Sequence, residues 1–380
     1  VQHPADAEDS DTITTHFEYH CMEDNLLKLD MLGHDDPTMI RMLEDLTGVN
    51  ARTIPLDDPD TMSIFTSSKV LGFENDDLLG PTGAVAIPEF NTRFTRQMLI
   101  DTQPKDFNTL VRLSGFSHGT DVWLGNAREL IVSGTASVLE TVGCRDDIML
   151  YLISMGLDPK MSFKIMEAVR KGKVKKGGFQ DGWVEAMQEH DVPEWYIESL
   201  AKIGYLFPKA HAVAYVMMAF RIAWFKVHEP LAFYATFFSI RAKAFDAAEC
   251  CKDADALRRR IREIENNKDA TAVEQDLMTT LEVCYEFCLR GFHFEPIDIY
   301  RSDATKFVVT ENGLLPPFTS VRGLGETAAL DTVEKRKGKD FTSVEEFSLC
   351  CNKLSQTHID QLRALGAFAG LPETSQLTLF

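Results

Sequence analysis

The sequence has no Cys-x-x-Cys pair, no low-complexity tract and no long uninterrupted hydrophobic run. Its eight cysteines include two adjacent pairs, which make a poor disulfide framework and lack the spacing of a zinc site. We interpret them as reduced cysteines of a cytosolic protein. The longest apolar stretch contains Arg221 and Lys226, so we expect a buried amphipathic helix, too short and too charged to cross a membrane.

Positive charge is also scarce, since 39 lysines and arginines face 58 acidic residues and the formal net charge is -19. This excludes a globally basic nucleic-acid binder but leaves room for a basic groove on an acidic body. The 380 residues, 44% of them hydrophobic, are enough for two or three domains. The opening residues lack an initiating Met and an apolar run, so we expect no signal peptide at this start, and they resemble a point inside a longer protein.

Hydrophobic periodicity predicts a mostly α fold with small β elements, an α+β class. Residues 25–33 alternate like a strand, and a helix follows with Asp35 or Asp36 as its cap and Pro37 in its first turn. Helices continue to about residue 245, interrupted by turns that include a basic one. The other expected segments are the basic turn at 170–178, two charged helices within 246–292, short strands and turns at 294–318, and short helices around glycine turns in the last 60 residues.

A glycine turn near the end has the form of a helix-hairpin-helix, and LRALGAFAGL is expected to place a second glycine turn between helices. Glycines let the backbone approach a phosphate, and the amides of the following helix point at it. The turn and the basic cluster after it are the candidate DNA-binding residues Gly323, Leu324, Gly325, Lys335, Arg336 and Lys337. An ordinary helical hairpin is the alternative.

Other candidate sites pair anion-binding side chains with helix ends. Arg93 and Arg96 lie on one helix face, where paired guanidiniums suit a triphosphate, although such pairs usually form a solvated face. Ser117 and His118 belong to a glycine-rich polar segment that suits a tight pocket or a capped turn. Lys209 and His211 begin the apolar helix; cations there oppose the helix dipole, and a bound anion would explain them as well as solvent exposure would.

Taken in order, the segments LLKLDMLGHDDPT, PEFNTRF, SGFSHGTDVWLGNA, GCRDDIM, FPKAHAVAYVMMAFRIAWFKVHEPL and LLPPF…GLG resemble the C-terminal part of the PolC type of bacterial DNA polymerase III alpha subunits. The resemblance covers the chain from about residue 15 to its end. It implies a family C polymerase with a polymerase-beta-like palm. The implied regions are the end of the palm at 1–40, fingers at 41–245, a connecting, clamp-proximal region at 246–316, a tandem helix-hairpin-helix region at 317–372 and a clamp-binding tail at 373–380.

The resemblance also implies roles for single residues. Asp30 matches the third carboxylate of a site that holds two Mg²⁺ ions for nucleotidyl transfer. The residues that match the nucleotide-facing region are Arg93, Arg96, Ser117, His118, Lys209 and His211. The implied partners are primer-template DNA, deoxynucleoside triphosphates, the sliding clamp and other replisome subunits, in the cytoplasm and without a membrane.

The family's Asp-x-Asp pair, which precedes the third carboxylate, is absent from the matching position. The two Asp-x-Asp triplets, 58–60 in a proline turn and 253–255 on a charged helix, both follow Asp30. We therefore expect these 380 residues alone not to polymerise DNA. Two alternatives stay open, a non-catalytic helix-hairpin-helix DNA-binding module and a metabolic enzyme with a pocket around His118.

The final residues, QLTLF, are unusually apolar for a chain end. In the resembling family such a peptide docks in a groove of the sliding clamp, which implies clamp contacts for Gln376, Leu377, Leu379 and Phe380. The polar segment GLPETS before them suits a flexible spacer. The alternative is a tail folded into the protein's own core.

Overall fold

The computed structural model describes residues 11–18, 21, 22, 25–27, 29, 33–311 and 313–374. The chain divides into two compact units, Val1–Asp35 and Asp36–Phe380. The described residues of the first unit form turns and extended segments without an α-helix. Much of the expected strand at 25–33 lies outside the described residues, and so does the expected metal ligand Asp30.

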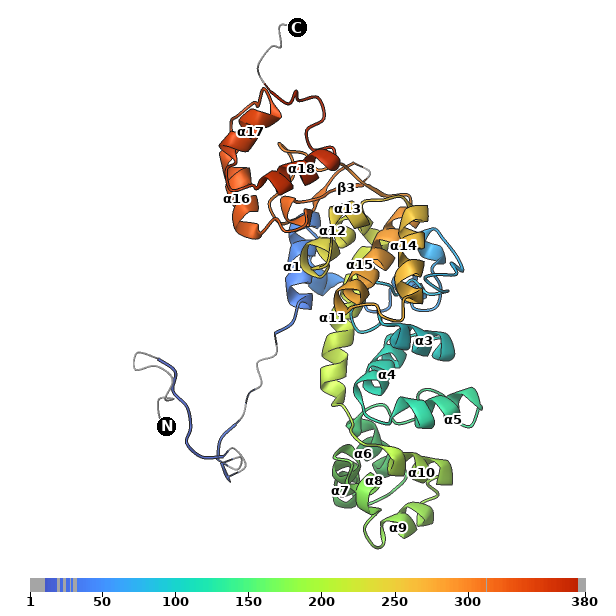
Figure 1. Ribbon diagram of the computed structural model, residues 1–380. Coiled ribbons are helices and arrows are strands. Elements are labelled where there is room, and N and C mark those ends of the chain that lie inside the picture. Colours follow the sequence, from blue (N-terminus) through green and yellow to red (C-terminus); the bar gives the residue numbers. More distant parts are fainter. Residues whose placement is uncertain are drawn as a thin grey trace. The chain divides into compact units, whose positions relative to one another are not determined.

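The second unit begins with helix α1 (Asp36–Thr47), as predicted from Asp36 and Pro37 (Figure 1). Side-chain caps fix the starts of two later helices, at Pro59 and at Arg93. The Asp58 side chain accepts a hydrogen bond from the backbone N–H of Thr61, and the Thr92 side chain accepts one from that of Thr95. The triplet Asp58-Pro59-Asp60 was expected in a turn, but Asp58 caps a short helix that begins at Pro59. The bounds that follow are η2 (Ala51–Thr53), α2 (Pro59–Ser63), η3 (Lys69–Leu71), α3 (Arg93–Thr102), α4 (Phe107–His118), η4 (Trp123–Ala127) and α5 (Arg128–Val132).

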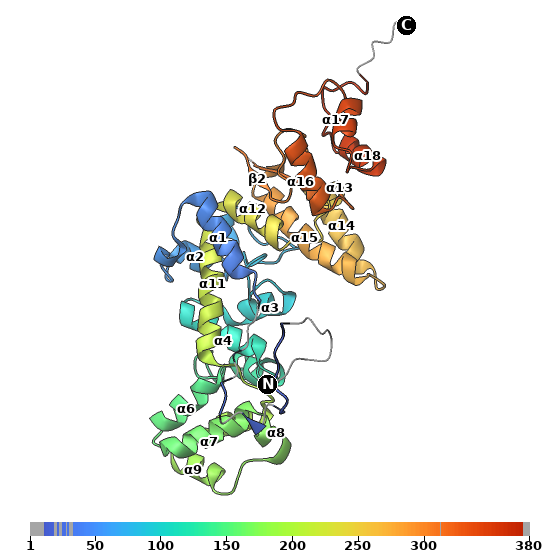
Figure 2. The same cartoon turned by 90° about the vertical axis from the view of Figure 1, so that its left-hand side faces the viewer.

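A group of short helices comes next, in which α6 and α7 pack together (Figure 2) and α8 contacts both α7 and α10. Their bounds are α6 (Arg145–Ser154), α7 (Pro159–Arg170), α8 (Lys173–Gly177), α9 (Trp183–Glu189) and α10 (Glu194–Lys202). The segment expected as a basic turn at 170–178 therefore contains a short helix, because Gly172 and Gly178 supply the left-handed backbone at its two ends.

Helix α11 (Lys209–His228) is the central helix of this unit and contacts α1, α2, α4, α6 and α12 (Pro230–Ile240). With 20 residues it is long and apolar enough to cross a membrane by length and composition alone, so our expectation that it is too short and too charged was wrong. The expectation of a buried helix was right. Its side chains at Val216, Phe220 and Phe225 are fully buried in the main hydrophobic core.

The predicted charged helices are confirmed as α14 (Ala254–Asn266) and α15 (Ala272–Leu289), preceded by α13 (Ala247–Cys250). A three-stranded sheet follows, with β1 (His293–Phe294) parallel and β2 (Val308–Val309) antiparallel to the central β3 (Gly313–Leu315). A side chain at Gly313 would lie 2.1 Å from the carbonyl oxygen of His293, so the close pairing requires glycine. These elements confirm the mostly α fold with small β elements.

The C-terminal helices enclose a second, smaller core that includes Phe318, Phe347 and Leu362. Their bounds are η5 (Phe318–Ser320), α16 (Glu326–Lys335), α17 (Val344–Cys350) and α18 (Gln356–Ala364). The first helix expected before the Gly323 turn is only the single turn η5. The second glycine segment follows α18 and leads into turns, without a further helix in the described residues up to 374. The tandem arrangement therefore differs in detail from the sequence prediction.

Candidate nucleotide and nucleic-acid sites

A cavity of about 450 Å³ opens between the loop before α3, the end of α4, the end of α12 and α15. It brings together the two predicted residues Ser117 and His118. It adds polar groups that the sequence analysis missed, namely Glu89, Asn91, Thr92, Thr95, Arg241 and Thr279. Glu89, Asn91 and Thr92 lie in the segment PEFNTRF, of which only Arg93 was chosen as a site residue, whereas Arg241 and Thr279 come from distant segments that no local motif links to it. We refer to this cavity as the His118 pocket.

The loop that forms one wall of the His118 pocket has an unusual backbone. Ala86 and Glu89 adopt φ angles of +64° and +68°, which cost on the order of 1 kcal/mol each for residues with a side chain. The backbone N–H of Ala86 donates to Oδ1 of Asn91 at 2.6 Å. Such strain persists only when surrounding contacts fix the loop, and it is characteristic of functional sites.

Two titratable groups meet in the pocket, with Nε2 of His118 2.7 Å from Oε2 of Glu89. Burial, reinforced by the nearby Asp36 carboxylate, raises the pKa of Glu89 to about 7. Burial, together with His211, lowers the pKa of His118. Both shifts favour the neutral forms, so near neutral pH the carboxyl group keeps its proton part of the time and the imidazole is largely neutral.

The His118 pocket also contains a cation, Arg241, which directly follows the last residue of α12. Its Nη1 lies 3.2 Å from Oδ1 of the fully buried Asp36, and its side chain keeps 36% of its surface exposed. A guanidinium held by one carboxylate retains donors for a second anion. Arg241 is therefore the pocket residue best suited to a phosphate.

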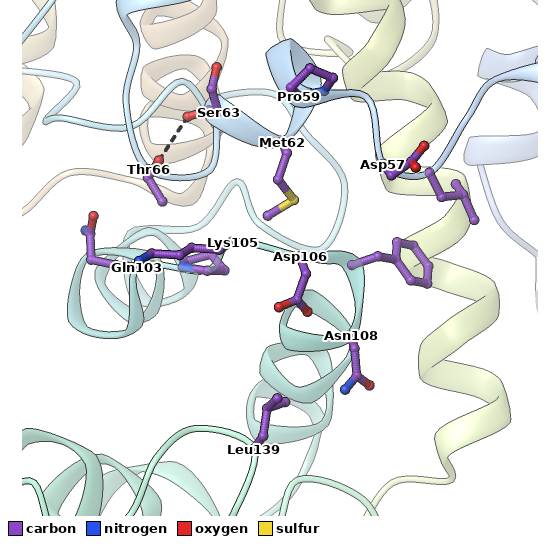
Figure 3. A pocket seen from close by; sticks show the side chains of 13 residues that line it. Asp57, Pro59, Met62, Ser63, Thr66, Gln103, Lys105, Asp106, Asn108 and Leu139 are labelled. Carbon is purple, nitrogen blue, oxygen red and sulfur yellow. Dashed lines mark hydrogen bonds between the residues drawn. The ribbon is translucent and has the colours of Figure 1, made fainter.

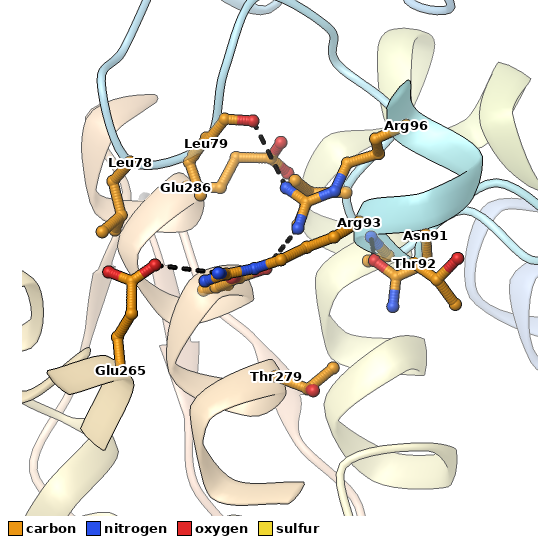
Figure 4. Close-up of polar contacts among 12 residues, drawn as sticks. Leu78, Leu79, Asn91, Thr92, Arg93, Arg96, Glu265, Thr279 and Glu286 are labelled. Atoms are coloured by element: carbon orange, nitrogen blue, oxygen red, sulfur yellow. Dashed lines mark hydrogen bonds and ion pairs between the residues drawn. The ribbon is translucent and has the colours of Figure 1, made fainter. Parts of the chain in front are cut away.

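The predicted pair Arg93 and Arg96 faces carboxylates of α14 and α15 (Figure 4). Arg96 is buried, and its guanidinium reaches Glu282 at 2.8 Å and the carbonyl oxygen of Leu79 at 3.3 Å. Arg93 is 54% exposed and pairs with Glu265 at 2.8 Å. A triphosphate would have to displace Glu282 to reach Arg96, whereas Arg93 keeps an open side.

Lys209 and His211 have partners within the protein as well. Nζ of Lys209 lies 3.3 Å from Oδ1 of Asp147, so a carboxylate already offsets the cation at the start of α11. The ring of His211 packs between Phe207, at 4.9 Å, and Tyr215, at 4.4 Å. Phe207 also contacts the ring of His118 at 4.8 Å, so the two predicted histidines share one aromatic neighbour.

Behind the loop lies a buried charge network that the sequence analysis missed. Nζ of Lys226 donates to the carbonyl oxygens of Gly83 at 2.8 Å and Val85 at 2.6 Å, and it lies 2.7 Å from Oε1 of Glu286. Burial lowers the pKa of Lys226 to about 8. Tyr234 donates to the same carboxylate at 2.6 Å. This network holds the backbone just before the strained turn at Ala86.

In the C-terminal region Gly323 has a φ of +78°, as a tight turn requires, and Gly325 precedes the first residue of α16. Leu324 is buried in the smaller core, with 3% of its surface exposed. The basic residues after the turn make internal contacts. Lys335 pairs with Asp331 at 2.9 Å, Arg336 donates to the carbonyl oxygen of Ile299 at 2.9 Å, and Lys337 pairs with Glu334.

Two predicted sites lie outside the described residues, namely Asp30 and the tail residues Gln376, Leu377, Leu379 and Phe380. Among the residues that the structure describes, no group of three or more His, Cys, Asp or Glu side chains is placed to hold a metal ion. The eight cysteines are free thiols, as expected.

A larger cavity, of about 850 Å³, lies between α2, the loop before α4 and Leu139 (Figure 3). The side chains of Met62 and Phe107 line it, together with Lys105 and Asp106. The Asp106 carboxylate accepts from the backbone of Thr109 at 2.8 Å and so caps α4. No pattern in the sequence marks this cavity, and the polar groups that line it form no catalytic pair.

The family model of the bacterial DNA polymerase III alpha subunit finger domain matches residues 36–191, and that of the helix-hairpin-helix motif matches residues 291–377. Proteins named DNA polymerase III PolC-type match the whole chain. The one from Caldanaerobacter subterraneus subsp. tengcongensis is 55% identical, that from Halalkalibacterium halodurans 52% and that from Bacillus subtilis 50%. The chain spans about a quarter of the length of these relatives (27%, 26% and 26%). Over its whole length the chain is therefore similar to one region of DNA polymerase III PolC-type proteins, and it carries matches to the finger-domain and helix-hairpin-helix models.

Proposed function

We propose that this chain is a working part of a replicative, template-directed DNA polymerase and supplies its nucleotide-binding fingers, its grip on duplex DNA and its attachment to a sliding clamp. The observation that carries the proposal is the His118 pocket, which lies largely within the segment matched by the finger-domain model. The division into 1–40, 41–245, 246–316, 317–372 and 373–380 belongs to the same proposal.

In this proposal the incoming nucleotide approaches the His118 pocket with its phosphates toward Arg241 and its polar groups toward Ser117 and His118. Glu89 would repel a phosphate when ionised, and its raised pKa reduces that repulsion near neutral pH. His211 flanks the pocket through Phe207, whose ring contacts both histidines, and Lys209 lies two residues before His211 at the start of α11. Arg93 is better placed than Arg96 to contribute, because its side chain is largely exposed.

Photocrosslinking tests this pocket directly. A photoreactive deoxynucleoside triphosphate, added with primer-template DNA, should label the unmodified chain within residues 86–118. Labelling should fall at least about tenfold in Arg241→Gln, because a charged hydrogen bond contributes roughly 1.5–3 kcal/mol. Arg259→Gln, on the exposed face of α14, is the matched control and should label normally. Equal labelling of both variants, or labelling elsewhere only, would refute the nucleotide site.

Magnesium enters the proposal through Asp30, one of the three carboxylates that the family uses for its two Mg²⁺ ions. Because these 380 residues lack a matching Asp-x-Asp pair, we expect them to bind DNA and nucleotide without extending a primer. A primer-extension assay with all four nucleotides and Mg²⁺ tests this, and robust incorporation would overturn it.

Residues 376–380 are proposed to dock on the sliding clamp, with Gln376 at the rim of a groove and the apolar side chains inside it. Such a peptide binds with roughly micromolar affinity, about 8 kcal/mol. Deleting 376–380 should abolish binding to the clamp and leave the melting temperature unchanged. A large drop in melting temperature would favour a tail that packs in the core. The proposed location is the replisome in the cytoplasm.

A non-catalytic helix-hairpin-helix module is the second candidate, supported by the motif match at 291–377 and the turn at Gly323. It predicts salt-sensitive duplex binding without nucleotide binding. Duplex binding combined with no crosslinking in the experiment above would favour it.

A further inference from the structure

The segment formed by α7 and α8, residues 159–178, carries seven basic residues and one acidic residue, in contrast to the net charge of -19 of the whole chain. Its lysines are all exposed, at positions Lys160, Lys164, Lys171, Lys173, Lys175 and Lys176. Like charges held this close repel one another, and a bound anion relieves that repulsion.

Few carboxylates neutralise these lysines. Glu167 lies 3.2 Å from Lys171 and also pairs with Arg170, and Asp121 lies 2.6 Å from Lys175. Within the described part of the chain, no ion pair engages the remaining four, which are Lys160, Lys164, Lys173 and Lys176. Their charge is therefore available to a partner. Lys171 is only partly neutralised as well, because it shares the single Glu167 carboxylate with Arg170.

Close backbone packing fixes α8 against the segment that leads to the His118 pocket. Gly172 has a φ of +66°, and a side chain there would lie 2.5 Å from the carbonyl oxygen of Gly204. The backbone N–H of Leu206 donates to the carbonyl oxygen of Arg170 at 3.3 Å. The next residue, Phe207, contacts the ring of His118. The lysines are thus held on a rigid support that connects to the pocket.

An exposed aromatic ring lies among the lysines. Phe163 keeps 49% of its surface exposed. It follows Lys160 by three positions on α7 and directly precedes Lys164, so it shares the outer face of the helix with Lys160. Ammonium groups beside an exposed ring suit single-stranded nucleic acid, whose phosphates need cations and whose unpaired bases stack on aromatic side chains.

We propose that the surface formed by Lys160, Phe163, Lys164, Lys171, Lys173 and Lys176, the α7–α8 basic surface, binds single-stranded DNA. A duplex would engage the lysines but offer no free base face to Phe163. That the bound strand is the template entering the polymerase rests on the proposed function, whereas the binding itself does not.

The test measures the anisotropy of a fluorescein-labelled oligothymidine with the full 380-residue chain across a salt series. The variant Lys171→Gln/Lys173→Gln/Lys176→Gln is compared with Lys69→Gln/Lys105→Gln/Lys268→Gln, which changes the net charge equally on exposed lysines elsewhere. We expect the first to bind at least about tenfold more weakly at low salt. Its salt dependence, the slope of log K against log salt, should fall by about 2. The second should bind like the unmodified chain.

A second variant separates stacking from charge. Phe163→Ala should weaken oligothymidine binding on the order of tenfold while leaving the salt slope unchanged. Since Phe163 is half exposed, the substitution should leave the melting temperature close to that of the unmodified chain. A duplex probe serves as the reference, and its affinity should change little in Phe163→Ala.

Equal oligothymidine affinity and salt slope in the two triple variants would overturn the proposal. The proposal would also be overturned if the first triple variant bound oligothymidine normally but bound vesicles containing phosphatidylglycerol more weakly than the unmodified chain. That result would indicate that the surface binds lipid. If the unmodified chain binds oligothymidine but is not labelled by the photoreactive nucleotide, the proposed function is refuted and the α7–α8 basic surface is not. The failure of the proposed function can therefore be distinguished from the failure of this inference.

Discussion

Two clusters of basic residues in this chain differ in burial and in their pairing with carboxylates. Around α15, Arg96 and Lys226 are buried and meet the carboxylates of Glu282 and Glu286. On α7 and α8, lysines are exposed and largely without carboxylate partners in the described residues. Buried cations require partners because desolvation is costly, whereas exposed ones are stabilised by water. Arg96 and Lys226 therefore stabilise the fold, whereas the positive charge of α7 and α8 is only partly neutralised within the described residues.

The largest expected effect comes from breaking the buried network. Lys226→Met should lower the free energy of unfolding by about 3–5 kcal/mol, because it leaves the Glu286 carboxylate buried without its cation. Chemical denaturation measures this, with Lys268→Met on the exposed surface as the control. The double variant Lys226→Met/Glu286→Leu should recover part of the loss. A Lys226→Met protein as stable as the control would erase the contrast between the two clusters.

The His118 pocket lies between these extremes, and pH tests it. The pKa of Glu89 is about 7 in the folded protein and near 4.5 when unfolded. Between these values the folded state keeps a proton that the unfolded state has lost, so stability falls as pH rises through the window. The fall attributable to Glu89 is at most about 3 kcal/mol.

Glu89→Gln should remove that part of the pH dependence and leave the opposite, smaller contribution of His118, whose pKa is lowered. Urea denaturation of both proteins at several pH values between 4.5 and 7 gives the difference. Parallel stability curves for the two proteins would mean that Glu89 ionises normally.

A smaller effect should separate the two arginines of α3. Arg96→Gln should cost about 2 kcal/mol, since Glu282 loses its buried partner but keeps Arg93 at 3.4 Å. Arg93→Gln should cost less than about 1 kcal/mol, as for other exposed pairs. Thermal unfolding of the two variants in parallel provides the measurement. Equal losses would show that exposure does not decide the role of these residues.

Local patterns predicted the helices well, because their caps and periodicity lie within a few residues. The capping box of Thr271 and Glu274 and the cap at Asp253 mark the starts of α15 and α14. The fate of charged side chains depends on partners far away in the sequence. Arg96 meets Glu282 across 186 residues, and Lys226 meets Glu286 across 60. A single sequence carries no signal for such pairs.

The same limit applies to the pocket and the glycine turn. Ser117 and His118 could be proposed from their own segment, but Arg241 and Glu89 join them only through the packing of α12 and the strained loop. The residues before Gly323 were expected to form a helix, yet they form the single turn η5, because Phe318 and Val321 are buried in the smaller core.

The smallest expected effect on stability belongs to the α7–α8 basic surface. Lys171→Gln/Lys173→Gln/Lys176→Gln should change the free energy of unfolding by less than about 0.5 kcal/mol per site, since exposed substitutions usually stay within that range. At low salt the variant should be slightly more stable than the unmodified chain, because the substitutions relieve repulsion among the lysines. This gain in stability should vanish at high salt, which screens the repulsion. Denaturation at low and high salt measures both. A marked, salt-independent loss of stability would mean that these lysines support the fold, and the contrast with Lys226 would then fail.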